Sequence, residues 1–170
     1  MVFFFRSTTP KQQMDIALRE GNAVVLDDFG PNHEFDLEDP PDLLVLIYEN
    51  IHSRHTAVGL LALHYTEASR VWELGSMSAR KTFSHGRLFS LFMDKVPRII
   101  LEHMHDVTDS IWIVKRVMLT NRKHIEALKC MGFVEPPHFL IGVLSNDGYI
   151  PFDPFDEVLM KRQLNPIVST

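Results

Sequence analysis

The sequence predicts an α/β fold, with some α+β character, built around one mixed β-sheet. Three apolar runs, at residues 42–48, 57–65 and 70–76, are separated by short polar turns, which is typical of an antiparallel meander. A fourth apolar run, at residues 110–119, is followed by an amphipathic stretch and then by Gly132, which is typical of a strand and a helix with its C-terminal glycine. Together these patterns predict a mixed sheet with helices packed on it.

The first part of the chain is predicted to form a strand and a helix. Residues 2–5 are apolar but too few to span a membrane, so we interpret them as the first strand. Thr9 and Pro10 match the N-cap and the first position of a helix that we expect to end near Gly21. Residues 23–26 fit either a helix or a strand.

The second half of the chain is predicted to add two helices and three strands. A helix is expected to begin near Arg87, and Pro97 within its apolar pattern predicts a kink or a split. Residues 122–131 are expected to form the next helix, after the strand at 110–119. The last two strand candidates are residues 139–144 and 157–162, which are joined by a turn.

Composition limits the classes of protein to which the chain can belong. Its 170 residues predict a single domain spanning residues 1–170, and 45% hydrophobic with 23% charged residues is ordinary for a globular protein. The net charge of −5 leaves no overall basic surface for nucleic acid, and no apolar run approaches the length of a membrane span. The 9 histidines have no regular ligand spacing, so we expect no metal site. Cys130 is the single cysteine, which excludes an intrachain disulfide and predicts a cytoplasmic location.

Acidic residues gather in two places, at residues 34–42 and 153–157. One interpretation is that they are solvated loops. The other is that they form an acidic rim that attracts a cationic substrate or partner.

The order of elements and the run from Trp72 to Phe133 resemble the GNAT superfamily of acetyl-CoA-dependent N-acetyltransferases. The resemblance implies a mixed, splayed central sheet of six to seven strands flanked by about four helices. In that fold two central strands part and admit the pantetheine arm of acetyl-CoA. The implied activity is direct transfer of an acetyl group to an amine, on a small molecule or a protein, in a ternary complex.

The loop before the central helix carries one part of this resemblance. The family pattern is Gln or Arg, two residues, Gly, one residue, then Gly or Ala; in register with Gly86, Lys81 replaces the Gln or Arg and Ser84 replaces the first Gly. Backbone N–H groups at a helix N-terminus bind phosphate groups, and the helix dipole assists them. The resemblance implies a pyrophosphate-binding set made of Arg80, Lys81, Ser84, His85, Gly86 and Arg87. The alternative is a basic loop that caps an ordinary helix.

The segment from Asn121 to Phe133 carries the other part. Family members often have Asn after the strand and Gly-Phe after the helix, and here Asn121 precedes Gly132 by 11 positions. The resemblance implies that Asn121 contacts the pantetheine or the helix start, whereas the alternative is an N-cap alone. Many active members place a general-acid Tyr where this chain has Leu128, which cannot donate a proton. Cys130 is expected to be a buried small hydrophobe.

A general base is needed to take a proton from the attacking amine. Glu73 is the preferred candidate, because its neighbours Trp72 and Leu74 should face the core and leave it on the other surface. The alternative is a solvated carboxylate on a strand. The other candidates, which the sequence does not rank, are His64, His85 and His124.

A second function is open beside the enzyme. The segments 87–89, 110–112, 124–125 and 128–133, with Asn121, are similar to small GNAT-like proteins encoded by short-tailed bacteriophages. That resemblance implies a catalytically degenerate protein with a structural or assembly role in the virion. Its partners would be phage structural proteins, and its location the host cytoplasm or the particle. The Phe-rich segments 2–5 and 149–155 would then be interface candidates.

Overall fold

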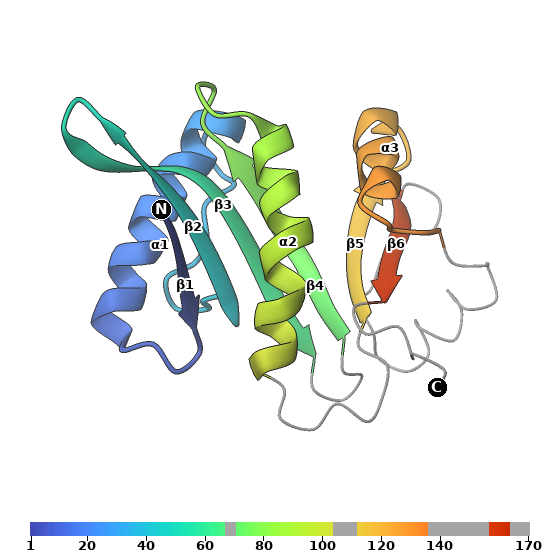
Figure 1. Cartoon of the computed structure of the whole chain (residues 1–170), viewed down its shortest axis with the longest axis horizontal. Coiled ribbons are helices and arrows are strands. Elements are labelled where there is room, and N and C mark those ends of the chain that lie inside the picture. Colours follow the sequence, from blue (N-terminus) through green and yellow to red (C-terminus); the bar gives the residue numbers. More distant parts are fainter. Residues whose placement is uncertain (67–70, 104–111, 136–156, 164–170) are drawn as a thin grey trace. The chain divides into compact units, whose positions relative to one another are not determined.

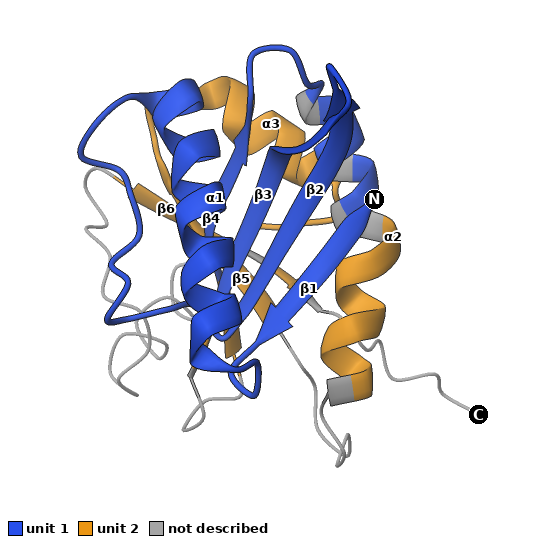
Figure 2. Ribbon diagram, turned by 90° about the vertical axis from the view of Figure 1, so that its left-hand side faces the viewer, with its two compact units in different colours: residues 1–64, 74–92 blue, residues 65–73, 93–170 orange. Residues whose placement is uncertain are grey.

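The computed structural model describes residues 1–66, 71–103, 112–135 and 157–163 (Figure 1). The chain divides into two compact units, residues 1–64 with 74–92 and residues 65–73 with 93–170 (Figure 2). The strand predicted at 139–144, the turn after it and the Phe-rich segment 149–155 lie outside the described residues. The elements are β1 (Val2–Arg6), α1 (Lys11–Phe29), β2 (Leu43–Ile51), β3 (Arg54–Thr66), β4 (Val71–Ala79), α2 (His85–His103), β5 (Trp112–Met118), α3 (Arg122–Cys130) and β6 (Glu157–Gln163).

The six strands form one sheet in the order β1-β2-β3-β4-β5-β6 (Figure 1). Pairing is antiparallel between β1 and β2, between β2 and β3, and between β5 and β6. β4 and β5 are parallel, and their register covers three pairs, from Val71 with Trp112 to Glu73 with Val114. The predicted mixed sheet is therefore confirmed.

The hairpin between β2 and β3 is tighter than the polar turn predicted from the sequence. His52 and Ser53 have φ angles of 49° and 63°, in the left-handed region. Two successive residues with positive φ reverse the chain in the sense that matches the twist of the strands. The strands therefore continue to Ile51 and resume at Arg54.

Helix α1 is longer than predicted, because Gly21 lies inside it and does not end it. A Cβ on Gly21 would lie 2.6 Å from Leu60 Cδ1, so the glycine lets α1 approach β3 closely. Residues 23–26, which fit either structure, are helical, and the helix ends where the N–H of Gly30 (φ 83°) donates to the carbonyl of Leu26 at 3.0 Å. A glycine inside a helix can thus serve packing as well as termination.

The predicted capping of α1 by Thr9 is wrong. Thr9 Oγ1 accepts a hydrogen bond from the N–H of Arg6 at 2.9 Å, and the Thr9 N–H donates to the Arg6 carbonyl at 2.8 Å. Both groups are used in the turn after β1, and Pro10 takes the N-cap position.

The core of the first unit lies between α1 and the strands β2 and β3, which α1 crosses in Figure 2. It is made of Met14, Ala17, Leu18, Val24, Val25, Leu44, Leu46, Tyr48, Ala57, Leu60 and Ala62. These residues recur at helical spacing in α1 and at alternate positions in β2, so one face of each element is apolar.

Helix α2 is one helix from His85 to His103, so Pro97 does not split it. Proline removes one helical hydrogen bond and crowds the preceding turn. Val96, Ile99 and Ile100 flank Pro97 and are buried, with exposed fractions of 0%, 8% and 0%. Burial of these side chains stabilises the second half of the helix despite the proline. None of the helices in the described ranges is long and apolar enough to cross a membrane.

The packing at Gly21 gives a test by mutation. Gly21→Val should destabilise the protein by about 2 kcal/mol, because a branched side chain would collide with Leu60. The matched control is Ala23→Val, at an exposed position of the same helix, which should change stability by less than about 1 kcal/mol. Urea unfolding measures both, and equal losses would mean that helix propensity, and not packing, explains Gly21.

Candidate functional site

The loop from β4 to α2 is anchored to the neighbouring strand by Arg80. Its guanidinium Nε donates to the carbonyl of Ala57 at 2.7 Å, and its backbone N–H donates to the carbonyl of Val58 at 2.8 Å. The Phe83 N–H donates back to the Arg80 carbonyl at 2.8 Å, which closes a turn, and Phe83 is 5% exposed. Arg80 thus positions the loop rather than offering its whole guanidinium to a ligand.

Two carboxylates from the end of α1 hold the backbone of the same loop. Asp28 Oδ2 accepts the N–H of Ala79, and Asp27 Oδ2 accepts the N–H of Lys81, each at 3.0 Å. Hydrogen bonds between a carboxylate and a backbone N–H are strong because one partner is charged. The sequence did not reveal these contacts, since Asp27 and Asp28 read only as polar residues of an uncertain segment.

The loop leads directly into the N-terminus of α2. The first residue of the helix is His85. The carbonyl of the preceding residue, Ser84, accepts the N–H groups of Arg87 and Leu88 at 3.1 and 3.3 Å. Helix geometry leaves the first N–H groups without intrahelical acceptors. The first turn of the helix itself carries no acidic residue, which favours an anion at this end.

Gly86 does not have the positive φ that would by itself require a glycine. Among the described glycines, positive φ occurs at Gly30 and Gly132. A Cβ on Gly86 would lie 3.4 Å from Ser84 Oγ, which a small movement of that side chain accommodates. The remaining reason for glycine is close approach of another group to the exposed start of the helix.

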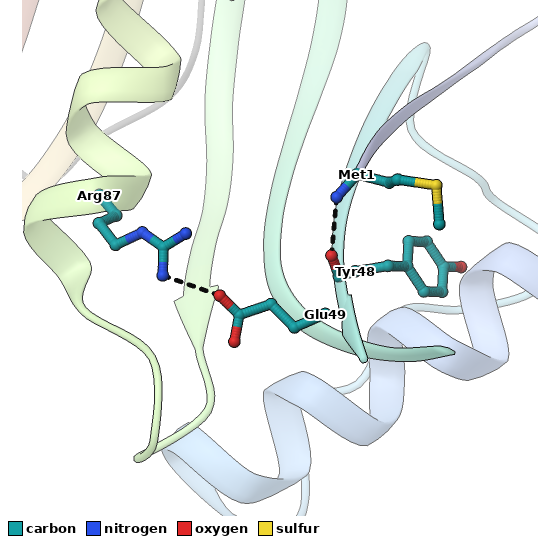
Figure 3. A network of polar contacts seen from close by, with 4 residues as sticks. All are labelled: Met1, Tyr48, Glu49 and Arg87. Atoms are coloured by element: carbon teal, nitrogen blue, oxygen red, sulfur yellow. Dashed lines mark hydrogen bonds and ion pairs between the residues drawn. The ribbon is translucent and has the colours of Figure 1, made fainter. Parts of the chain in front are cut away.

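The two basic residues that follow Arg80 in the chain lie on the surface. Lys81 is exposed. Arg87 Nη1 lies 2.8 Å from Glu49 Oε1 (Figure 3), and its guanidinium stacks 4.7 Å from the centre of the Phe83 ring. With exposed fractions of 66% and 36%, this ion pair is of the surface type that adds little stability. Arg87 can therefore exchange Glu49 for a more strongly charged ligand at little cost.

Glu73 lies in the second unit, on β4, and is paired with a cation that the sequence analysis did not identify. Arg116 Nε donates to Glu73 Oε1 at 2.8 Å, and the exposed fractions of the two side chains are 39% and 17%. Trp72 and Leu74 are buried at 3% and 0%, as expected, whereas Glu73 between them is partly exposed. The carboxylate is neither fully solvated nor free, because one of its oxygens accepts a guanidinium N–H.

Lys115, beside Arg116, is the other charged residue that sequence reasoning missed. It is half-buried on β5, where burial lowers the pKa of its ammonium to about 8; the charge of Glu73 opposes this shift and that of Arg116 adds to it. The signal was present, because Lys115 and Arg116 interrupt an otherwise apolar strand. The Nε1–H of nearby Trp72 is buried without a hydrogen-bond partner among the described residues.

Asn121 and Gly132 terminate α3 as the sequence predicts. The Asn121 side chain accepts the N–H of His124 at 3.2 Å, which is an N-cap hydrogen bond. At the other end the Gly132 N–H donates to Lys129, and the Phe133 N–H donates to Leu128, both at 3.0 Å. With Gly132 at φ 82°, this is a Schellman motif.

Two further residues of α3 differ in exposure. Leu128 is 0% exposed, so its side chain belongs to the core of the second unit. Cys130 is exposed, and the expectation that it would be a buried small hydrophobe is wrong. It is the last residue of α3 and lies two residues beyond Leu128 on the helix, which turns it away from the buried face. The described residues contain no group of three or more His, Cys, Asp or Glu that could hold a metal ion.

The candidate residues thus fall in two places. Arg80, Lys81, Ser84, His85, Gly86 and Arg87 belong to the first unit. Glu73 and Asn121 belong to the second, together with Arg116 and Lys115. The first group is suited to an anion, because it combines exposed cations with a helix N-terminus. The second group offers a carboxylate to accept a proton.

Comparison with solved structures identifies the fold. The ribosomal-protein-S18-alanine N-acetyltransferase from Escherichia coli superimposes with a TM-score of 0.61 at 10% identity, over 98% of this chain and 96% of that one. A GNAT-family acetyltransferase from Staphylococcus aureus superimposes with a TM-score of 0.60 at 16% sequence identity, over 97% of this chain and 100% of that one. Aminoglycoside 6′-acetyltransferase type Ii gives 0.57 at 14%, over 98% of each. The predicted GNAT-like fold is therefore confirmed. No family model and no curated protein sequence matches the chain.

The environment of Lys115 predicts a pH-dependent stability. The pKa of Lys115 is about 8 in the folded protein, compared with an ordinary value of 10.5. Between these two pH values the unfolded chain binds more protons than the folded protein does, so the free energy of unfolding rises with pH. Lys115→Met should therefore stabilise the protein most below about pH 8, and the gain should shrink towards pH 10. The control is Lys123→Met, at an exposed position of α3, whose effect should not change with pH. Urea unfolding at several pH values measures both differences, and a constant gain for Lys115→Met would contradict the assignment.

Proposed function

We propose that the chain is an N-acetyltransferase that transfers the acetyl group of acetyl-CoA to an amine in a ternary complex. The observation that carries the proposal is the likeness of 98% of the chain to N-acetyltransferases of the same fold. The acceptors named for such structures differ widely, from a protein alanine to an aminoglycoside and spermidine. Because substrate pockets differ within one fold, the likeness supports the reaction class and leaves the acceptor open.

The loop at the start of α2 is the proposed site for the pyrophosphate of acetyl-CoA. Lys81 and Arg87 carry exposed positive charge, and the first N–H groups of α2 face no acidic residue of their own helix. Ser84, His85 and Gly86 supply the backbone at which the helix begins. Arg80 is assigned a positioning role, since its Nε is bound to the Ala57 carbonyl.

Glu73 is the proposed general base. Acetyl-CoA supplies an activated acetyl group as a thioester. As the amine nitrogen bonds to the acetyl carbon and the carbon–sulfur bond breaks, the amine loses one proton, which Glu73 takes directly or through water. Arg116 holds Oε1 of the carboxylate and leaves Oε2 to accept the proton. Leu128 donates nothing, so the thiolate leaves unprotonated or takes a proton from another group. We assign Asn121, an exposed residue whose Oδ1 caps α3, to the pantetheine arm.

The second candidate function is a protein that keeps the fold and has lost the chemistry, with a structural role in a phage particle. The burial of Leu128 and the ion pair between Glu73 and Arg116 favour it, because both replace reactive groups by structural contacts. The exposed Phe3, at 45%, would then belong to an interface with other virion proteins.

Binding of acetyl-CoA tests the loop. Calorimetry should detect binding to the wild type, and Lys81→Glu should weaken it by at least about tenfold through charge reversal beside the pyrophosphate. The matched control is Lys95→Glu, an exposed lysine farther along α2, which should bind as the wild type does. No binding to the wild type at millimolar acetyl-CoA would reject the enzyme, and equal binding by both variants would show that Lys81 is not in the site.

Turnover tests the base and separates the two candidate functions. Release of free coenzyme A thiol should be measured with spermidine, an aminoglycoside and a peptide with an N-terminal alanine. Glu73→Gln should lower kcat with any active acceptor by about 100-fold or more and leave acetyl-CoA affinity unchanged. A wild type that binds acetyl-CoA but acetylates none of these amines would favour the non-catalytic candidate. A Glu73→Gln protein with full kcat would reject Glu73 as the base.

A further inference from the structure

An open pocket of about 520 Å³ lies in the first unit, between the edge strand β1 and helix α1. Its apolar lining comes from Met1, Phe3, Phe5, Ile16 and Ala17. Side chains alternate along a strand, so Met1, Phe3 and Phe5 all point to the same face of β1, toward α1. The volume falls in the range of pockets that hold small molecules.

The pocket has an unusually apolar and accessible wall. Met1 is 63%, Phe3 45% and Ile16 52% exposed. Neighbouring large apolar side chains left in water are more informative than single ones, because they mark binding surfaces. β1 pairs with β2 on one side only and is the first strand of the sheet, so no further strand of the described sheet covers this edge.

One carboxylate sits among these apolar groups. The Tyr48 hydroxyl donates a hydrogen bond to Glu20 Oε2. Burial raises the pKa of Tyr48, and the hydrogen bond and charge of Glu20 raise it further, so the phenol remains a proton donor at neutral pH. Glu20 is half-buried, and its other oxygen, Oε1, makes no hydrogen bond or ion pair with any residue of the described segments. The contact with Tyr48 fixes the direction in which that oxygen points.

The other groups at the pocket leave this negative charge uncompensated. The Met1 ammonium donates to the main-chain carbonyl of Tyr48 at 2.8 Å (Figure 3) rather than to Glu20. His55 lines the pocket from β3 and is exposed. The rings of Phe3 and Tyr48 meet edge to face, with centroids 5.4 Å apart, and so form a rigid aromatic corner.

We propose that this pocket binds a small organic cation, an ammonium or guanidinium group carried on an aromatic or branched apolar body. Glu20 Oε1 would accept the cationic N–H, and the apolar body would cover Phe3 and Ile16. A cation beside aromatic faces gains further attraction from their electrons. The Glu20 carboxylate determines the charge of the ligand, because an anion would be repelled and a neutral ligand would leave a partly buried charge unpaired. The site does not depend on acetyl transfer and needs no acetyl-CoA.

The test uses three probes of one shape and different charge on the full chain without acetyl-CoA. These are 2-phenylethylammonium, the neutral 2-phenylethanol and the anion 3-phenylpropionate. Chemical-shift titration should show the cation binding at least about tenfold more tightly than the other two. Glu20→Gln should remove this preference, and Asp15→Asn, on the same helix outside the pocket lining, should keep it. Ile16→Trp, which fills the pocket from an exposed position, should weaken the binding of all three probes. This variant tests the location of the site if Glu20→Gln does not fold.

Three outcomes would overturn the proposal. The first is equal affinity for the three probes, and the second is no shift with the cation at about 10 mM, a concentration at which even weak ligands bind. The third is a concentration-dependent dimer, seen by analytical ultracentrifugation, that Phe3→Ala converts to a monomer, since a second copy would then occupy the pocket. Absence of acetyl-CoA binding by the wild type would reject the enzyme proposal and leave all of these results unchanged, so the two failures are distinguishable.

Discussion

The close packing of α1 against β2 and β3 is the constraint on which the rest of the first unit depends. A Cβ added to Gly21 would lie 2.6 Å from the Leu60 side chain, so the glycine allows the helix to pack closely on β3. At the end of α1 Asp27 and Asp28 reach the loop before α2. Near its middle Glu20 reaches Tyr48. The candidate anion loop and the apolar pocket are therefore both held by a single helix.

The end of α1 illustrates how a local penalty is offset by a tertiary contact. Negative charge at the C-terminus of a helix opposes the helix dipole, and the last turn of α1 carries no basic residue to compensate. Asp27 and Asp28 are nevertheless placed there, and each accepts a backbone N–H of the loop. The carboxylates hold the backbone of the loop that leads into the N-terminus of α2. A preformed loop loses less entropy when it binds a ligand.

Local signals were predictable from the sequence, and long-range contacts were not. The ends of α3 were predictable, because Asn121 and Gly132 interact with backbone groups only a few residues away. By contrast, Asp27 and Lys81 are 54 residues apart, and Arg116 and Glu73 are 43 apart. No pattern in either segment identifies the partner in the other. Gly21 misled for the same reason, since its role depends on Leu60 across the core.

The arrangement of β5 and α3 places limits on the chemistry that the second unit can perform. Leu128 and Phe133 are buried at 0% and 1% and are joined by the hydrogen bond that ends α3, so position 128 serves the architecture. Successive residues of a strand point to opposite faces, so Arg116 reaches Glu73 while Lys115 lies on the other face, opposite the buried Met160 of β6. That position explains why burial dominates the pKa of Lys115 even though Glu73 is near. An ammonium with a pKa of about 8 exchanges its proton readily near neutral pH, whereas Leu128 has none to give.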